Sequence, residues 1–302
     1  MTSQPRRGEP LPLGGADLPY SKGLMARALI ATGVPADQAY QLARRIELDL
    51  AERNARVMEL ERVRELAHGV LGQSAGDQAV DRLRRVQELH QLDMPIVILV
   101  GGATGTGKST VATEVAHRLG ITRVTSTDFI RQTMRAFFSQ EFMPSIHYSS
   151  FDAAAAVPDS ETGDPVLLGF LDQTRNVVVG VRAAVERALQ EGWSMVLEGV
   201  HLVPGMLGSI ENALVVHCVL AISNEQVHAS HFFVRDANSQ GLRPVEKYTT
   251  QLVEIRRIQE YIVERARRAD VPVVENANVE LAVGGVVELV LAAAERLETV
   301  SA

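Results

Sequence analysis

The chain of 302 residues is 46% hydrophobic and 22% charged, which suits one large or two medium soluble domains with a sizeable core. Its formal net charge of −7 argues against a protein that coats nucleic acid, because such proteins are usually basic. The single cysteine, Cys218, excludes an intramolecular disulfide and a cysteine-based zinc site, and it fits a reducing, cytoplasmic setting.

The N-terminal part of the chain is predicted to be helical and to lack strands. Residues 1–17 contain Pro, Gly and Arg without an apolar signal core, so we expect a disordered tail and no secretion. No apolar run is long enough to cross a membrane. Residues 18–92 are interpreted as a helical module, with helices from Tyr20 to about Thr32, from Pro35 through Leu50, over Val57–Leu66 and over Val80–Leu92, and a break over Gly69–Gly76.

In residues 93–302, apolar strands alternate with amphipathic helices, which is typical of a parallel sheet flanked by helices. The predicted strands are Ile96–Val100, Ile121–Thr125, Ser194–Leu197, Leu214–Ala221 and Val271–Val274. The predicted helices are Ser109–Leu119, Asp128–Phe138, Thr174–Glu191, Lys247–Arg268 and Val279–Glu298.

The turn after the first strand carries the most specific motif. Gly102–Ser109 fits G-x-x-x-x-G-K-[ST], in which glycines let the backbone N–H groups surround an anion at a helix N-terminus. We expect a nucleoside triphosphate here, with Lys108 reaching its β- and γ-phosphates and the Ser109 hydroxyl on Mg²⁺. The fold class is therefore predicted as α/β, a kinase-type P-loop NTPase with five parallel strands and an N-terminal mainly helical module. The predicted nucleotide-binding residues are Gly102, Ala103, Thr104, Gly105, Thr106, Gly107, Lys108, Ser109 and Thr110.

Polar residues also follow the second and third strands, at the sheet edge where ligands of open α/β sheets bind. Asp128 is predicted to orient or deprotonate an acceptor hydroxyl, and Arg131 and Arg135, one helical turn apart, to bind an anion. The alternative is an N-cap aspartate with two solvated arginines. Glu198 ends an apolar strand and is predicted to hold the metal, or else to cap the next loop. His201 contacts the substrate or is a polar loop histidine.

Two further segments are candidates for the substrate site. His147, Ser149 and Ser150 lie in a run that could bind a carboxylate or phosphate, or form an ordinary Ser-rich turn. The polar stretch from Arg235 to Arg243 and Lys247 is predicted to be a lid, with Arg235 stabilising charge on the transferred group. Otherwise Arg235 and Arg243 are solvated loop charges.

Some signatures are absent from the sequence. There is no Asn-Lys-x-Asp run for guanine, no Leu-Ser-Gly-Gly-Gln run of transporter ATPases, and no interleaving of aromatic and basic residues for single-stranded nucleic acid. Their absence argues against a GTPase switch, a transporter ATPase and a nucleic-acid partner.

From about Leu18 onward the chain resembles the 2-phosphoglycerate kinase family. The resemblance rests on Leu18–Arg27, Ala39–Tyr40 and Ala43–Glu47 in an ATP-cone-like N-terminal segment, and on Gly101–Ser109, Ser126–Asp128 with Arg131, His147–Phe151 and Leu197–His201 in the kinase part. It implies a cytoplasmic enzyme that uses ATP and Mg²⁺ to convert 2-phosphoglycerate, a small anionic substrate, to 2,3-bisphosphoglycerate. It also implies that Ser149 and Ser150 belong to the acceptor site.

Two alternatives to this reading stay open. The first keeps the mechanism and changes the acceptor to 3-phosphoglycerate, an inositol phosphate or another phosphorylated metabolite. The second is a regulatory protein that binds a nucleoside triphosphate. A regulatory role for residues 18–92, or a role in forming a homodimer, is a hypothesis.

Overall fold

The computed structural model describes residues 20–157, 163–238 and 245–301, with only the backbone described for residues 234–238 and 298–301. The predicted tail, residues 1–17, lies outside this part. The chain divides into two compact units, one of residues 1–93, 117–120 and 291–302 and the other of residues 94–116 and 121–290. None of the helices in the described residues combines the length and the apolar character that crossing a bilayer requires.

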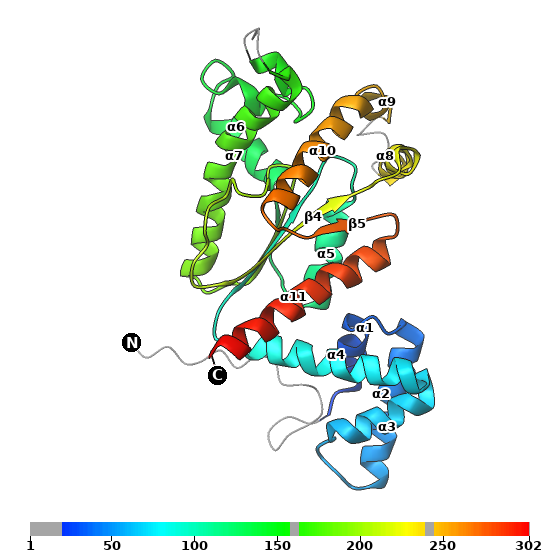
Figure 1. Ribbon diagram of the computed structural model, residues 1–302. Helices are drawn as coiled ribbons and strands as arrows, with labels where there is room; N and C mark the ends of the chain where they lie inside the picture. Colours follow the sequence, from blue (N-terminus) through cyan, green and yellow to red (C-terminus); the bar gives the residue numbers. More distant parts are fainter. Residues whose placement is uncertain (1–19, 158–162, 239–244, 302) are drawn as a thin grey trace. The chain divides into compact units, whose positions relative to one another are not determined.

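Four helices make up most of the first unit: α1 (Lys22–Ala31), α2 (Ala36–Glu52), α3 (Leu60–Leu71) and α4 (Gln73–Gln91) (Figure 1). They bury one apolar cluster that includes Met25, Leu42 and Ile46, each fully buried. The predicted break over Gly69–Gly76 was too long. Only Gly72, at a positive φ of 83°, separates α3 from α4, because a single residue in this conformation is enough to redirect the chain.

The second unit contains a parallel five-stranded sheet in the order β2-β3-β1-β4-β5. The strands are β1 (Ile96–Gly101), β2 (Val124–Ser126), β3 (Met195–Glu198), β4 (Leu214–Ala221) and β5 (Val273–Glu275). Glu198 is in register with Val100 on one side and with Ser126 on the other. The ends of β1, β2 and β3 therefore meet at one edge, as the predicted α/β fold requires.

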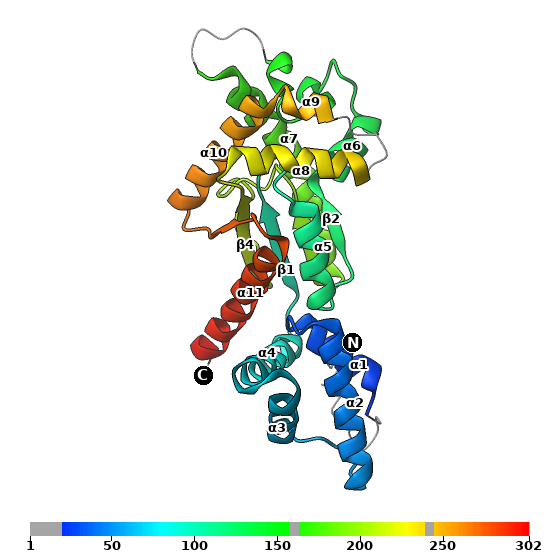
Figure 2. The same ribbon diagram turned by 90° about the vertical axis from the view of Figure 1, so that its right-hand side faces the viewer.

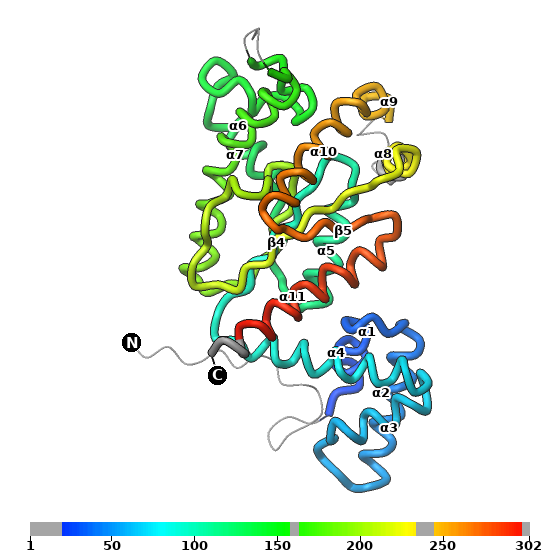
Figure 3. The backbone as a smooth tube through the Cα atoms, in the orientation of Figure 1, coloured from blue at the N-terminus to red at the C-terminus, as the bar shows by residue number. Residues whose placement is uncertain are grey.

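Helices flank this sheet (Figures 1 and 2). The segments are α5 (Lys108–Arg118), α6 (Thr127–Phe137), α7 (Pro165–Gln190), α8 (Glu225–Asn238), α9 (Val245–Thr249), α10 (Leu252–Arg268) and α11 (Val279–Ser301), with two 3₁₀ turns, η1 (Pro144–His147) and η2 (Ala153–Ala156). Side chains of α6 and α7 bury the apolar residues of β1 and β3, and α10 packs beside β4. The backbone trace in Figure 3 follows these crossovers.

The structure corrects two predicted helices and adds a third that was not predicted. α7 begins nine residues before the predicted Thr174, because the Asp164 side chain accepts from the N–H of Val166 and Pro165 fits the first turn. α8 was not predicted, although Asn224 caps it by accepting from the N–H groups of residues 226 and 227. The predicted helix Lys247–Arg268 is interrupted at residues 250–251 and forms α9 and α10.

The predicted strands β2 and β5 were each placed too early. The N–H of Ile121 donates to the carbonyl of Ala116, and that of Val271 donates to the carbonyl of Ala266. Ile121 and Val271 therefore close the turn that follows the preceding helix, and the strands begin two or three residues later.

Candidate active site

The glycine loop after β1 is folded tightly against the sheet and α8. Gly102 has a φ of 138°, and a Cβ there would lie 2.4 Å from the carbonyl oxygen of Leu220. Gly105 and Gly107 also have positive φ values, of 85° and 79°. Lys108 begins α5 and is only 9% exposed, and its Nζ donates to the carbonyl of Ala103 at 2.6 Å across the loop. Only glycines allow this path, so the loop has the geometry of an anion cradle.

The hydroxyl of Ser109 and the carboxylate of Glu198 are joined at the end of β3. Ser109 Oγ donates to Glu198 Oε1 at 2.9 Å, and Glu198 is 7% exposed. No cluster of three His, Cys, Asp or Glu side chains suited to a metal occurs in the described residues. One hydroxyl and one carboxylate fit Mg²⁺, which prefers oxygen ligands and takes few of them from protein when phosphates are present.

Asp128 and Arg131 form an ion pair on the first turn of α6. Asp128 Oδ1 accepts from Arg131 Nε at 3.0 Å and from Nη2 at 2.8 Å, while Arg131 Nη1 donates to the carbonyls of Ile146 and Tyr148. The Asp128 side chain is 63% exposed and the Arg131 side chain 7%. The carboxylate therefore faces the cavity, whereas the guanidinium also braces the chain at residues 146–148.

Arg135 does not share this arrangement. Its Nη1 donates to the amide oxygen of Gln132 at 2.9 Å on the exposed side of α6. The expectation that Arg131 and Arg135 face one anion is therefore not met in this structure, because Arg131 is turned inward by its bonds to main-chain carbonyls.

His201 is buried in a network of neutral hydrogen bonds. Its Nε2 lies 2.9 Å from Gln173 Oε1, and its Nδ1 lies 2.8 Å from Thr127 Oγ1. The amide nitrogen of Gln173 donates to the carbonyls of Ser145 and Tyr148, so its oxygen must accept from His201 Nε2–H. The Thr127 hydroxyl then donates to Nδ1. Burial lowers the pKa of His201 to about 3, which keeps the imidazole neutral.

The segment from η1 to Phe151 lies opposite the glycine loop. Ser150 Oγ is 3.5 Å from Thr104 Oγ1, and Ser149 Oγ accepts from Lys247 Nζ at 3.3 Å. His147 points elsewhere, with Nε2 3.0 Å from the carbonyl of Phe138. Of the predicted residues in this run, the two serines line the cavity and His147 does not line it in the described part of the chain.

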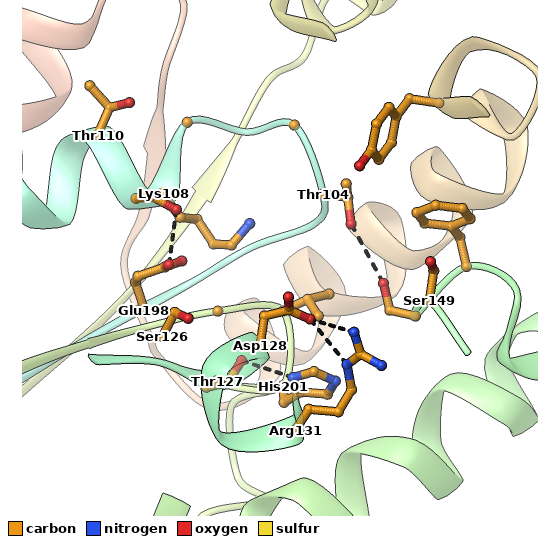
Figure 4. Close-up of a pocket in the computed structure, with 18 of the residues that line it drawn as sticks. Thr104, Lys108, Thr110, Ser126, Thr127, Asp128, Arg131, Ser149, Glu198 and His201 are labelled. Atoms are coloured by element: carbon orange, nitrogen blue, oxygen red, sulfur yellow. Dashed lines mark hydrogen bonds and ion pairs between the residues drawn. The ribbon is translucent and has the colours of Figure 1, made fainter. Parts of the chain in front are cut away.

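A cavity of about 920 Å³ connects these groups. Lys108 and Asp128 point toward the same open space in Figure 4, with Ser149 at its far side. Twelve predicted site residues line it: Thr104, Gly105, Gly107, Lys108, Ser109, Thr110, Asp128, Arg131, Ser149, Ser150, Glu198 and His201. Gly102, Ala103 and Thr106 shape the loop behind it. The backbone of Arg235 belongs to α8, but its side chain and all of Arg243 lie outside the described residues.

No family model matches the sequence. The 2-phosphoglycerate kinase of Pyrococcus furiosus is 36% identical over 275 residues, which cover 91% of this chain and 90% of that protein. The 2-phosphoglycerate kinase of Thermococcus kodakarensis is 37% identical over 87% of this chain and 89% of its own length. The chain belongs to the 2-phosphoglycerate kinase family. Membership makes it a phosphotransferase with an ATP-binding P-loop domain, as the motifs indicated.

The 2-phosphoglycerate kinase of Methanothermobacter thermautotrophicus, 37% identical over 89% of each chain, extends the family similarity across both units. Among solved structures, a gluconokinase from Sinorhizobium meliloti 1021 covers 68% of this chain and 94% of its own at 18% identity. Its TM-score is 0.34, a likeness too low to support a conclusion about this family member.

Several residues that surround this kinase cavity were missed in the sequence. Gln173 lies on α7 ahead of the predicted start of that helix, so the Asp164-Pro165 start signal would have revealed it. His231 and Tyr248 line the cavity from α8 and α9, and Asn276 follows β5. A histidine three residues after another on a capped helix, as at His228 and His231, was the available signal for α8.

Proposed function

We propose that this family member transfers the γ-phosphoryl group of ATP to the 3-hydroxyl of 2-phosphoglycerate, giving 2,3-bisphosphoglycerate and ADP. The observation that carries the proposal is one cavity with Lys108 and the Ser109–Glu198 pair on one side and the exposed Asp128 carboxylate on the other. The name of its relatives, 2-phosphoglycerate kinase, supports the choice of acceptor.

The acceptor carries a carboxylate and a phosphate beside its free hydroxyl. The groups that would bind these anions are the hydroxyls of Ser149 and Ser150, the Lys247 ammonium beside Ser149, and the remaining donor capacity of Arg131. Ser149, Ser150 and Arg131 line the same cavity as the glycine loop, and Ser150 Oγ lies 3.5 Å from Thr104 Oγ1, so an acceptor bound there would meet the triphosphate. His201, whose two nitrogens are both bonded, holds Thr127 and Gln173 in place instead of binding substrate directly.

Each of these residues would then have its own role in phosphoryl transfer. Asp128 orients the acceptor hydroxyl and accepts its proton as the oxygen attacks the γ-phosphorus. The bond from that phosphorus to the β–γ bridging oxygen breaks, and ADP leaves with the electron pair. Lys108 and the loop N–H groups neutralise charge on the β- and γ-phosphates, for which Lys108 exchanges the Ala103 carbonyl for phosphate oxygens. Arg235 is a further donor to the transferred group.

Ser109 and Glu198 would hold Mg²⁺. The ion, when bound, draws electron density from the β- and γ-phosphate oxygens and so stabilises the charge that develops there.

A substrate panel tests the proposal. The purified chain is incubated with Mg-ATP and 2-phosphoglycerate, 3-phosphoglycerate or an inositol phosphate, and ADP release and product mass are measured. We expect kcat/KM to be highest for 2-phosphoglycerate, with a product heavier by one phosphoryl group. Preference for another acceptor would support kinase activity but rule out 2-phosphoglycerate as the preferred acceptor. ATP binding without transfer to any of them would favour the regulatory alternative.

A further inference from the structure

Five successive carbonyls of the glycine loop, from Ala103 to Gly107, are all hydrogen-bonded. Three of the donors come from outside the motif: His228 Nε2 to Thr104 at 2.8 Å, His231 Nδ1 to Gly105 at 3.1 Å and Asn276 Nδ2 to Thr106 at 2.8 Å. The other two carbonyls accept from donors within the loop and α5, namely Lys108 Nζ and Thr106 Oγ1 to Ala103, and the N–H of Val111 to Gly107.

These bonds fix the orientation of whole peptide groups. In a trans peptide the C=O and the next N–H point in opposite directions. A carbonyl held toward α8 or β5 therefore turns the following N–H away from those elements. His228 acts in this way on the N–H of Gly105, and Asn276 acts on the N–H of Gly107.

His228 is held as rigidly as a core residue. It is fully buried, its ring stacks on Phe232 at 5.6 Å, and Phe232 stacks on Tyr248 of α9 at 5.1 Å. A Cβ on Gly105 would lie 2.4 Å from the Phe232 ring, so α8 presses directly on the loop. A rigid donor loses little freedom when its acceptor is fixed.

Only one tautomer of His228 serves this contact. The Thr104 carbonyl can only accept, so Nε2 carries the proton. Nδ1 is then a bare acceptor, and it is one of two buried side-chain atoms without a partner among the described residues. Burial also lowers the pKa of His228 to about 4. His228 thus donates to the loop carbonyl from Nε2 while its buried Nδ1 has no hydrogen-bond partner among the described residues.

We propose that His228 is a positioning residue for phosphate binding, which together with His231 and Asn276 holds the loop carbonyls outward and so presents the loop N–H groups to the phosphates before nucleotide binds. The proposal rests on the glycine loop being the triphosphate site of this kinase. It does not depend on which acceptor is phosphorylated.

The test measures binding of Mg-ATP and of tripolyphosphate, which lacks the nucleoside, by isothermal titration calorimetry. In His228→Phe the ring and its stacking remain, but the Thr104 carbonyl loses its donor. We expect both dissociation constants to rise about tenfold, the factor that 1.4 kcal/mol represents. His228→Gln places an amide nitrogen near Nε2 and is expected to restore most of the affinity. His231→Phe, at a half-buried site, is expected to raise both dissociation constants less than His228→Phe does.

The matched control is His90→Phe. His90 Nε2 also bonds one main-chain carbonyl, that of Leu119 at 2.9 Å, and His90 does not line the cavity in the described residues. The His90→Phe variant should bind Mg-ATP and tripolyphosphate as tightly as the unmodified chain does. Unchanged tripolyphosphate binding by His228→Phe would overturn the proposal, as would weaker binding of ATP alone, which would indicate a contact to the nucleoside.

A measurement on the unmodified chain covers the case in which His228→Phe does not fold. Long-range ¹H–¹⁵N spectra should show His228 with its proton on Nε2 throughout pH 7.5 to 5. A proton on Nδ1, or titration in this range, would contradict the proposal. Tripolyphosphate binding needs no acceptor, so a failure to phosphorylate 2-phosphoglycerate would leave this test valid.

Discussion

Asp128 and Arg131 show how one ion pair can join the proposed general base to a structural side chain. Oδ1 of Asp128 accepts two hydrogen bonds from Arg131, and the Asp128 side chain, 63% exposed, lines the cavity. Arg131 in turn bonds the carbonyls of Ile146 and Tyr148. Residues 145–150, here called the acceptor segment, include the proposed acceptor-binding serines. The position of this segment and the orientation of the proposed base Asp128 thus depend on the same guanidinium.

Replacing Asp128 with Ala should separate catalysis from nucleotide binding. A positioned general base contributes about 10²–10⁴-fold, so kcat for phosphoryl transfer should fall by about that factor. The dissociation constant of Mg-ATP should change by less than about threefold, because the phosphates are held by the glycine loop. Stopped-time ADP assays and calorimetry measure the two quantities. As a control, Glu186→Ala, at an exposed carboxylate of α7, should leave kcat and the dissociation constant of Mg-ATP unchanged. Equal losses in ATP binding and in phosphoryl transfer by Asp128→Ala would contradict the role of Asp128 as general base.

Gly199, directly after β3, has no room for a side chain. Its φ is 155°, and a Cβ would lie 1.8 Å from Thr127 Oγ1, the partner of His201. Gly199→Ala should therefore lower the free energy of unfolding by about 2 kcal/mol or more, measured in urea. Gly284→Ala in α11, where nothing lies within 4 Å of the added methyl, should instead raise it by about 0.5–1 kcal/mol. Equal effects of the two changes would show that the contact with Thr127 does not matter.

At the scale of elements, α6 and α7 hold the acceptor segment through its carbonyls. Gln173 of α7 donates to Ser145 and Tyr148, and Arg131 of α6 donates to Ile146 and Tyr148. Ser149 and Ser150 follow directly. A segment without regular strands or long helices is thus fixed by two side chains, each from a rigid helix.

Gln173→Leu should loosen this segment and leave the glycine loop intact. We expect KM for 2-phosphoglycerate to rise at least fivefold, with KM for ATP within twofold. The carbonyls of Ser145 and Tyr148 each lose a donor, and the buried Nε2–H of His201 loses its acceptor, which costs about 1–3 kcal/mol. Steady-state kinetics in both substrates measure the split. Arg182→Gln is the control, because Arg182 also donates from α7 to main-chain carbonyls, those of Met206 and Leu207, outside the cavity. A rise in KM for ATP alone would contradict the expectation.

The elements that sequence could predict are those whose signal is local. The glycine loop and the acid at the end of β3 follow from spacing alone, and the parallel sheet follows from the alternation of strands and helices. α8 could not be found by aliphatic periodicity, because its inward face carries His228 and Phe232. The inward turn of Arg131 and the hydrogen bonds of His201 depend on η1 and α7, which are distant in sequence, so no local pattern encodes them.

At the scale of the whole molecule, two units have separate cores, and the roles suggested for the N-terminal helices stay predictions. In the first unit, Asp49 is buried and its pKa is lowered chiefly by its hydrogen bond to Arg62.

A homodimer would show as twice the chain mass in sedimentation of the full protein. A mass of one chain at micromolar concentration would remove that hypothesis.

Acid should destabilise the second unit because unfolding lets its buried, neutral histidines take up protons. His201 has a pKa of about 3 in the folded chain and about 6.5 when unfolded, so the unfolded chain binds more protons below pH 6.5. Its contribution to stability is complete above pH 6.5 and falls as the pH is lowered, by about 2 kcal/mol at pH 5. His228 acts in the same direction. Urea unfolding at pH 7 and pH 5 measures the loss, which His201→Gln should reduce. Equal stability at both pH values would contradict neutral, buried histidines.

Phosphorus NMR of one reaction mixture tests the central claim most directly. The chain is mixed with Mg-ATP and 2-phosphoglycerate, and a parallel sample contains Lys108→Ala. The account predicts that the 2-phosphoglycerate signal is replaced by two phosphomonoester signals of one bisphosphorylated product as ADP appears, and that the variant gives neither. Release of inorganic phosphate with unchanged 2-phosphoglycerate, or no consumption of ATP by a chain that binds it, would contradict phosphoryl transfer to this acceptor.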